Sequence, residues 1–240
     1  MYDQMNNRQT PPPYYDGAAV ARQTNSVMKR VYVRMTLGLL VSAFCALGVA
    51  SSPALLSAIF GNQILFWGMI IAMFAMAIMI PVRMHKMSSG TVLVLFLVYA
   101  ALMGTFMSSI FILYQMSAIV STFFITAGTF GAMSVYGFFT KADLSKMGSF
   151  LMMALLGLII ASVVNIFLHS GTMDFIISIA GVLIFTGLTA WDTQQVKQLA
   201  AANLDPALAD KLATMGAMNL YLDFINLFLF LLRLFGGNRD

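Results

Sequence analysis

Long apolar stretches separated by short polar segments run through most of the chain. Seven of these stretches are long, at residues 31–50, 64–81, 90–108, 113–138, 148–168, 175–195 and 215–236. About 20 apolar residues are enough for a helix to cross the hydrocarbon core of a bilayer. The pattern therefore predicts an all-α integral membrane protein with seven transmembrane helices.

The N-terminal segment differs from the rest of the chain. Residues 1–24 are polar and Pro-rich, and they include the run PPPYY. Such a segment cannot bury enough apolar surface to offset the entropy lost when it becomes ordered. We therefore expect a disordered cytoplasmic tail over residues 1–24 and a transmembrane domain over residues 25–240.

Composition favours a membrane protein over a soluble one. Of the 240 residues, 60% are hydrophobic and only 9% are charged, whereas about a quarter of the residues in a soluble domain are charged. The net charge of +4 comes from short clusters between the apolar stretches. Such clusters are typical of orientation signals and do not indicate a nucleic-acid partner. We expect the lipid bilayer to surround the domain.

Positively charged residues fall in alternate connecting segments, which sets the predicted orientation. These residues are Arg22, Lys29, Arg30, Arg34, Arg83, Lys86, Lys141, Lys146, Lys197 and Lys211. Because Lys and Arg are enriched in cytoplasmic segments, the N-terminus is predicted to be cytoplasmic. Arg233, near the end of the last stretch, runs against this rule, so that stretch either spans fully or re-enters. The lack of a helix breaker before Gly236 favours a full span.

Small residues spaced four positions apart occur in two of the apolar stretches. They are Ala127, Gly128, Gly131 and Ala132 in one, and Gly157 and Ala161 in the other. Small residues at this spacing let helices approach closely in lipid. We expect both sets to lie at packed helix interfaces.

Two carboxylates lie in apolar surroundings. Asp223 falls inside the last stretch, and Asp192 lies near the end of the sixth. A charged side chain near the middle of a bilayer costs about 2.5–3.5 kcal/mol on insertion scales. The two stretches are antiparallel and are joined by a predicted cytoplasmic segment at 196–214. Both acids are therefore expected in the cytoplasmic half, where they can meet.

Two carboxylates that meet in a medium of low dielectric constant cannot both ionise cheaply. One proton shared between them relieves the repulsion and couples their titration. A pH-dependent switch is then chemically reasonable, and so is a weak divalent-cation site, since Ca²⁺ prefers carboxylate and carbonyl oxygens. Neighbouring polar residues are expected to support either carboxyl group by hydrogen bonds, namely Thr193, Gln194, Asn219, Tyr221 and Asn226.

A resemblance to a known family rests on three strings. TAWDTQQVKQ, followed about 20 residues later by NLYLDFINLFLFLLRLFG, resembles the paired C-terminal signature of the Bax inhibitor-1 family. STFFITAGTFGAMSVYGFFTKADLS resembles the fourth span of that family and the loop after it. The likeness covers residues 30–236 and is nearest to bacterial members, which implies a location in the inner (cytoplasmic) membrane.

The resemblance implies a fold in which six helices surround a central seventh. It also implies a pH-sensitive calcium leak controlled by two aspartates, which correspond to Asp192 and Asp223. In addition, it implies that a basic residue at the end of the second span latches onto the first aspartate, and Arg83 and Lys86 are both candidates. Calcium ions and protons would then be the ions handled, with Ca²⁺ as the transported ion and no cofactor.

Two other classes of function remain open. Some bacterial relatives resemble modulators of a membrane-bound protease, so the chain could be an intramembrane interaction protein that conducts no ions, and its N-terminal tail would be the discriminating feature. An intramembrane aspartyl protease also uses two buried aspartates. However, the Gly-x-Gly-Asp pattern of presenilin-like proteins is absent, because Asp223 follows LYL. We therefore expect that the chain is not an enzyme.

Overall fold

The computed structural model describes residues 17–202 and 205–236, and helices account for nearly all of them. The helices are α1 (Gly17–Ala50), α2 (Pro53–Phe60), α3 (Gln63–Arg83), the 3₁₀ turn η1 (Met84–Lys86), α4 (Ser89–Met107), α5 (Ile110–Leu113), α6 (Met116–Phe139), α7 (Ser145–Leu168), α8 (Gly171–Ala201) and α9 (Pro206–Phe235). Within the described ranges, seven helical segments are long and apolar enough to cross a membrane. The predicted seven-span, all-α fold is confirmed.

The first helix begins earlier than the sequence pattern indicated. Helix α1 starts at Gly17, so residues 17–24 are helical and their assignment to a disordered tail was wrong. This segment holds Ala and Arg residues that favour helix, and the amide of Gln23 donates to the carbonyl oxygen of Ala202 at 3.0 Å. The part of the predicted tail over residues 1–16 lies outside the described residues.

The predicted cytoplasmic segment at 196–214 is also mostly helical, because α8 and α9 extend beyond their apolar stretches. Helix α9 begins with Pro206 in its first turn, where a missing N–H costs nothing. The side chain of Asp205 caps this turn by accepting from the backbone N–H of Ala207 at 3.1 Å. Only a short connection therefore remains between the two helices.

A cluster of polar contacts fastens the extended part of α9 to α1. One guanidinium nitrogen of Arg34, Nη2, donates to Asp210 Oδ1 at 2.6 Å. The other, Nη1, donates to the Asp210 carbonyl oxygen at 2.6 Å and to Thr214 Oγ1 at 2.7 Å. Arg30 reaches the same carboxylate at 3.1 Å. We call these four residues the α1–α9 clamp; in the sequence its two arginines were recognisable only as topology signals.

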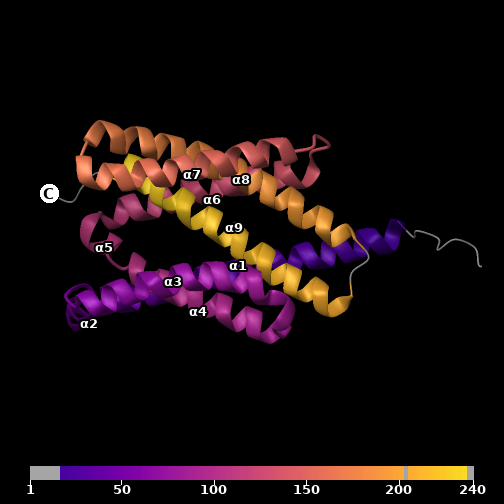
Figure 1. The fold of residues 1–240 in the computed structure, drawn as a ribbon, viewed down its shortest axis with the longest axis horizontal. Helices are drawn as coiled ribbons and strands as arrows, with labels where there is room; N and C mark the ends of the chain where they lie inside the picture. The colour runs from indigo at the N-terminus through magenta and orange to yellow at the C-terminus, as the bar shows by residue number, and fades with distance from the viewer. Residues whose placement is uncertain (1–16, 203–204, 237–240) are drawn as a thin grey trace, which may run out of the picture.

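Helix α9 is the most buried of the seven spanning segments. Within its most apolar window 72% of the residues are buried, against 6% for α7. It packs against α1, α4, α6 and α8. Figure 1 shows α9 running obliquely between α7 and α8 on one side and α3 and α4 on the other. The expected ring of six helices around α9 stays a prediction, since α3 packs mainly on α4 and α7 on α8.

The closest helix approaches occur at glycines other than the predicted ones. A Cβ atom on Gly104 would overlap with the backbone of α1 at Ser42, and one on Gly137 would overlap with the backbone of α8 at Ala190. The predicted interface glycines instead face open space, with no atom within 4 Å of an added Cβ, at Gly128, Gly131 and Gly157. Their assignment to packed interfaces was wrong, because spacing alone does not reveal which side of a helix meets a neighbour.

The last helix is continuous over its 30 residues, a length of about 45 Å. This continuity supports a full span over a re-entrant segment. The guanidinium of Arg233 pairs with Asp174 Oδ1 at 3.2 Å, near the start of α8. The ion pair with Asp174 explains how the positive charge of Arg233 is accommodated at this end of α9, although the distribution of Lys and Arg among the connecting segments does not favour one there. The start of α1 and the end of α9 lie at opposite ends of the bundle (Figure 1).

Candidate functional site

The hairpin of α8 and α9 brings the two predicted acidic residues together. Asp192 and Asp223 are 8% and 4% exposed. Their side chains lie within hydrogen-bonding range of each other. Both acids line the same cavity, and their role as a gating pair stays a prediction.

Both carboxylates line one cavity of about 610 Å³. Helix α9 contributes one face to it, at helical spacing, through Asn219, Leu222, Asp223, Asn226 and Phe230. Helix α8 contributes the face that carries Asp192, while α7 supplies mainly apolar side chains. From α3 the cavity receives a side chain at Phe74. The acidic pair therefore faces an open volume between helices and is not sealed inside a packed core.

One oxygen of the pair has no donor. Asp223 Oδ2 is buried, and within the described ranges it has no hydrogen-bond partner. A buried acceptor without a donor is costly, and more so when it carries charge. A proton held between the two carboxyl groups would supply the missing donor, and a cation in the cavity would neutralise the charge.

Of the five polar residues expected to support the carboxylates, two share the cavity with them. Asn219 and Asn226 line it, and the amide of Asn226 donates to the Leu222 carbonyl oxygen of its own helix at 2.8 Å. Gln195, which was not predicted as a site residue, also lines the cavity. Its position three residues after Asp192 was the available signal, because that spacing places both on one side of a helix.

The other three expected supporters have different surroundings. Gln194 accepts from the backbone N–H of Leu144 at 2.9 Å and donates to the Ala142 carbonyl oxygen at 2.8 Å, so it anchors the loop between α6 and α7. The Tyr221 hydroxyl lies 2.7 Å from Ser42 Oγ on α1. Thr193 Oγ1 is buried without a partner within the described ranges. In the described structure, none of these three side chains forms a hydrogen bond with Asp192 or Asp223.

The predicted latch is not formed in this structure. Arg83 ends α3 and Lys86 ends η1, and both side chains are exposed. Within the described ranges neither makes an ion pair with Asp192. Because α3 packs mainly on α4, either cation would need to move toward α8 to reach that carboxylate. The latch stays a prediction.

A polar pocket of about 490 Å³ adjoins the cavity toward the end where α7 meets α8. It is lined by His169, by the ion-paired Asp174 and Arg233, and by neighbouring polar groups. Ser162 and Ile166 line both this pocket and the aspartate cavity. The polar pocket and the aspartate cavity therefore lie next to each other along α7.

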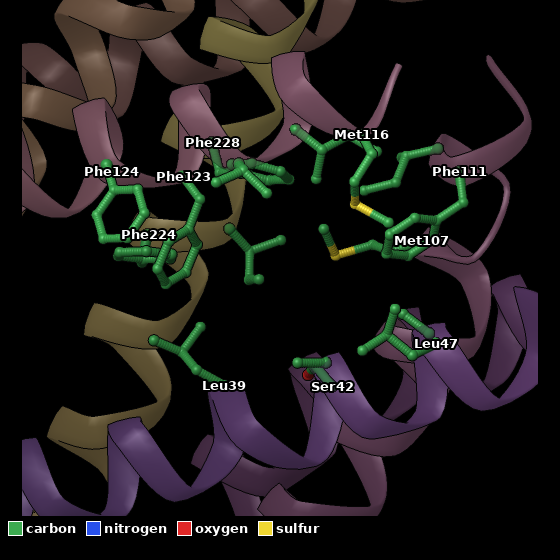
Figure 2. Close-up of a pocket in the computed structure, with 16 residues that line it drawn as sticks. Leu39, Ser42, Leu47, Met107, Phe111, Met116, Phe123, Phe124, Phe224 and Phe228 are labelled. Atoms are coloured by element: carbon green, nitrogen blue, oxygen red, sulfur yellow. The ribbon is translucent and has the colours of Figure 1, made fainter. Parts of the chain in front are cut away.

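A third cavity, of about 390 Å³, differs in chemistry from both (Figure 2). No charged side chain lines it, and its only polar lining residue is Ser42. The Ser42 hydroxyl is engaged, at 2.7 Å from both the Ala100 carbonyl oxygen and the Tyr221 hydroxyl. This cavity is unsuited to an ion, whereas the aspartate cavity is lined by two buried carboxylates and is therefore the candidate site.

The site has few ligands for a metal ion. Within the described ranges, no group of three or more His, Cys, Asp or Glu side chains could hold one. Ca²⁺ takes six to eight oxygen ligands. Two carboxylates and the neighbouring amide oxygens would leave most of that shell to water, which suits weak binding and rapid exchange.

Comparison with known proteins defines the class of protein. The family model described as Inhibitor of apoptosis-promoting Bax1 matches residues 24–240. The chain therefore belongs to the Bax inhibitor-1 family of membrane proteins, as the C-terminal strings indicated.

Individual relatives cover nearly the whole chain. It is 46% identical over 214 residues to the inner membrane protein YbhL of Escherichia coli K12, covering 88% of this chain and 92% of that protein. It is 46% identical over 217 residues to an uncharacterized protein of Borreliella burgdorferi, covering 90% and 94%. It is 38% identical over 221 residues to the uncharacterized protein YrjE of Lactococcus lactis, with the same coverage.

Proposed function

We propose that this protein is a cation leak pathway of the inner membrane that passes Ca²⁺ and is controlled by the protonation of Asp192 and Asp223. The observation that carries the proposal is the pair of buried carboxyl groups, within hydrogen-bonding range of each other, on the wall of an open cavity. Ionisable groups inside a membrane protein are costly and mark ion or proton pathways.

The proposed control follows from competition for the same oxygens. When the pair shares a proton, its hydrogen bond is satisfied and its charge is reduced. When that proton leaves, two adjacent negative charges remain, which a cation must neutralise. Ca²⁺ and a latch formed by Arg83 or Lys86 would compete for this role. Ca²⁺ binding in the cavity is therefore expected to weaken as the pH falls.

The arrangement of cavities supports a route for the ion. Along α9 the aspartate cavity extends from Asn219 to Phe230, which is about 16 Å at 1.5 Å per residue. At its far end the cavity adjoins the polar pocket through Ser162 and Ile166. An ion entering from the polar pocket would thus need to pass only Ser162 and Ile166, which line both volumes, to enter the cavity that holds the carboxylates.

Calcium influx into liposomes that contain the purified protein and a calcium dye tests the proposal. Wild-type protein is expected to give a pH-dependent influx, and Asp192→Asn and Asp223→Asn are each expected to change both its rate and its pH profile. Asp143→Asn is the matched control: it removes the same charge from an exposed loop, where hydrogen bonds from Ser145 hold the pKa of Asp143 below its ordinary value.

Absence of influx above that of empty liposomes at every pH would contradict the proposal. The alternative, an intramembrane interaction protein that modulates a membrane-bound protease, would then lead.

A further inference from the structure

The apolar cavity of Figure 2 forms a groove between two helices, α1 and α6, that pack mainly on other helices. Helix α1 lines one side and α6 the other, with α9 behind them and the α4–α5 corner at one end. Helix α1 packs mainly on α4 and α9, and α6 packs mainly on α8 and α9, so α1 and α6 are held apart by α9. Figure 2 shows the labelled side chains around an open space, with Leu39, Ser42 and Leu47 on α1 facing the others across it.

The groove has a buried floor and an exposed rim. The floor on α9 consists of Phe224, Ile225 and Phe228, each at most 5% exposed. The rim residues are 43–67% exposed and apolar, namely Leu47, Met116, Val120, Phe123 and Phe124. In a membrane-spanning helix, an exposed apolar side chain faces lipid. The groove is therefore continuous with the lipid-facing surface of the bundle.

The apolar lining of the groove favours a hydrocarbon ligand. Apolar cavities stay dry even at about 150 Å³ and bind apolar molecules instead, and this one measures about 390 Å³. An empty groove would forfeit the dispersion contacts of its lining atoms. The one polar side chain, Ser42, is already hydrogen-bonded within the protein and offers nothing to a polar ligand.

The size of the groove distinguishes a lipid chain from a protein partner. A helix with its side chains is about 10 Å across. A volume of 390 Å³ would therefore hold only about one turn of such a helix. A flexible acyl chain is thinner and can enter lengthwise from the bilayer.

We propose that this groove is a binding site for one acyl chain of a membrane phospholipid. The chain lies between α1 and α6 and contacts the aromatic floor formed by Phe224 and Phe228. Relative to Asp223, Phe224 and Phe228 are rotated by about 100° and 140° around α9, at about 100° per residue. The bound chain thus contacts α9 on a different side from the one that carries Asp223. This inference does not depend on ion conduction.

Photolabelling tests the site directly. The full-length protein is placed in phosphatidylethanolamine vesicles with a trace of the same lipid carrying a diazirine in its acyl chain, and labelled residues are mapped by mass spectrometry. We expect labels to concentrate in residues 39–47 and 107–124. The substitution Ala43→Trp fills the groove from α1, where Ala43 lines it, and should reduce this labelling about tenfold, which corresponds to ~1.4 kcal/mol.

Ala132→Trp provides the matched control. Ala132 is exposed on α6 and belongs to the lining of none of the cavities described above, so this variant should keep the wild-type labelling pattern. Thermal unfolding of both variants establishes that they are folded. Labelling spread evenly over all lipid-facing helices, or labelling of the groove that Ala43→Trp leaves unchanged in a folded protein, would overturn the proposal.

Discussion

Removing the guanidinium of the α1–α9 clamp is predicted to loosen one end of the bundle. Arg34→Met deletes the hydrogen bonds to Asp210 Oδ1, to the Asp210 carbonyl oxygen and to Thr214 Oγ1, all between 2.6 and 2.7 Å. Met keeps most of the apolar length of the side chain. The effect therefore reports mainly on the polar contacts.

The expected loss in the free energy of unfolding follows from the exposure of the paired side chains and from the contacts that remain in Arg34→Met. A hydrogen bond to a charged group contributes about 1.5–3 kcal/mol when buried, whereas an exposed ion pair contributes only about 0.2–1 kcal/mol. The Arg34 and Asp210 side chains are 15% and 26% exposed, between these limits. Asp210 would still pair with Arg30 at 3.1 Å, so no charge is left alone. We expect a loss of about 2 kcal/mol in the free energy of unfolding, well below the sum of three independent bonds.

The assay is unfolding by sodium dodecyl sulfate titrated into mild detergent, followed by circular dichroism. Lys29→Met is the control: it removes one positive charge from an exposed position on the same helix and should change the free energy of unfolding by less than about 0.5 kcal/mol. A double-mutant cycle with Asp210→Asn should give a coupling of about 1–2 kcal/mol. Equal losses in Arg34→Met and Lys29→Met, or a coupling near zero, would refute the reasoning.

Two further predictions concern contacts that hold helices and loops together. Gly137→Ala places a Cβ against the backbone of α8 and should destabilise the protein by about 1–3 kcal/mol. Gly157→Ala, where the space is open, should not destabilise it. Equal effects of the two substitutions on thermal unfolding would contradict this prediction. Gln194→Leu leaves the buried N–H of Leu144 without its acceptor and should cost about 1–3 kcal/mol. Faster hydrogen exchange at Leu144 is the measurement for that variant, and unchanged exchange would count against it.

The sequence was sufficient to predict the seven spans and to single out two acids that line one cavity. Long apolar stretches can only be helices in a bilayer, so the seven spans follow from length alone. Asp223 could be singled out because a carboxylate inside such a stretch is costly, and the hairpin then placed Asp192 beside it. Both predictions depend only on residues within one helix or on the short connection between two consecutive helices.

Features that depend on the relative rotation of helices could not be predicted. The small residues at Gly128 and Gly131 have the spacing of a packing motif, yet the helices meet at Gly137. Gln194 was expected to support a carboxylate but bonds to a loop about 50 positions earlier. Arg34 was a topology signal in the sequence, and only the packing of α1 on α9 shows that it also binds Asp210.

The competition between protons and Ca²⁺ at one carboxylate pair is the central claim, and proton release on calcium binding tests it most directly. The purified protein in weakly buffered nanodiscs is titrated with CaCl₂ near neutral pH while the pH is recorded. Wild-type protein should release up to about one proton per bound Ca²⁺, and Asp223→Asn should release almost none. Calcium binding without proton release, or the same release from Asp223→Asn, would contradict the account.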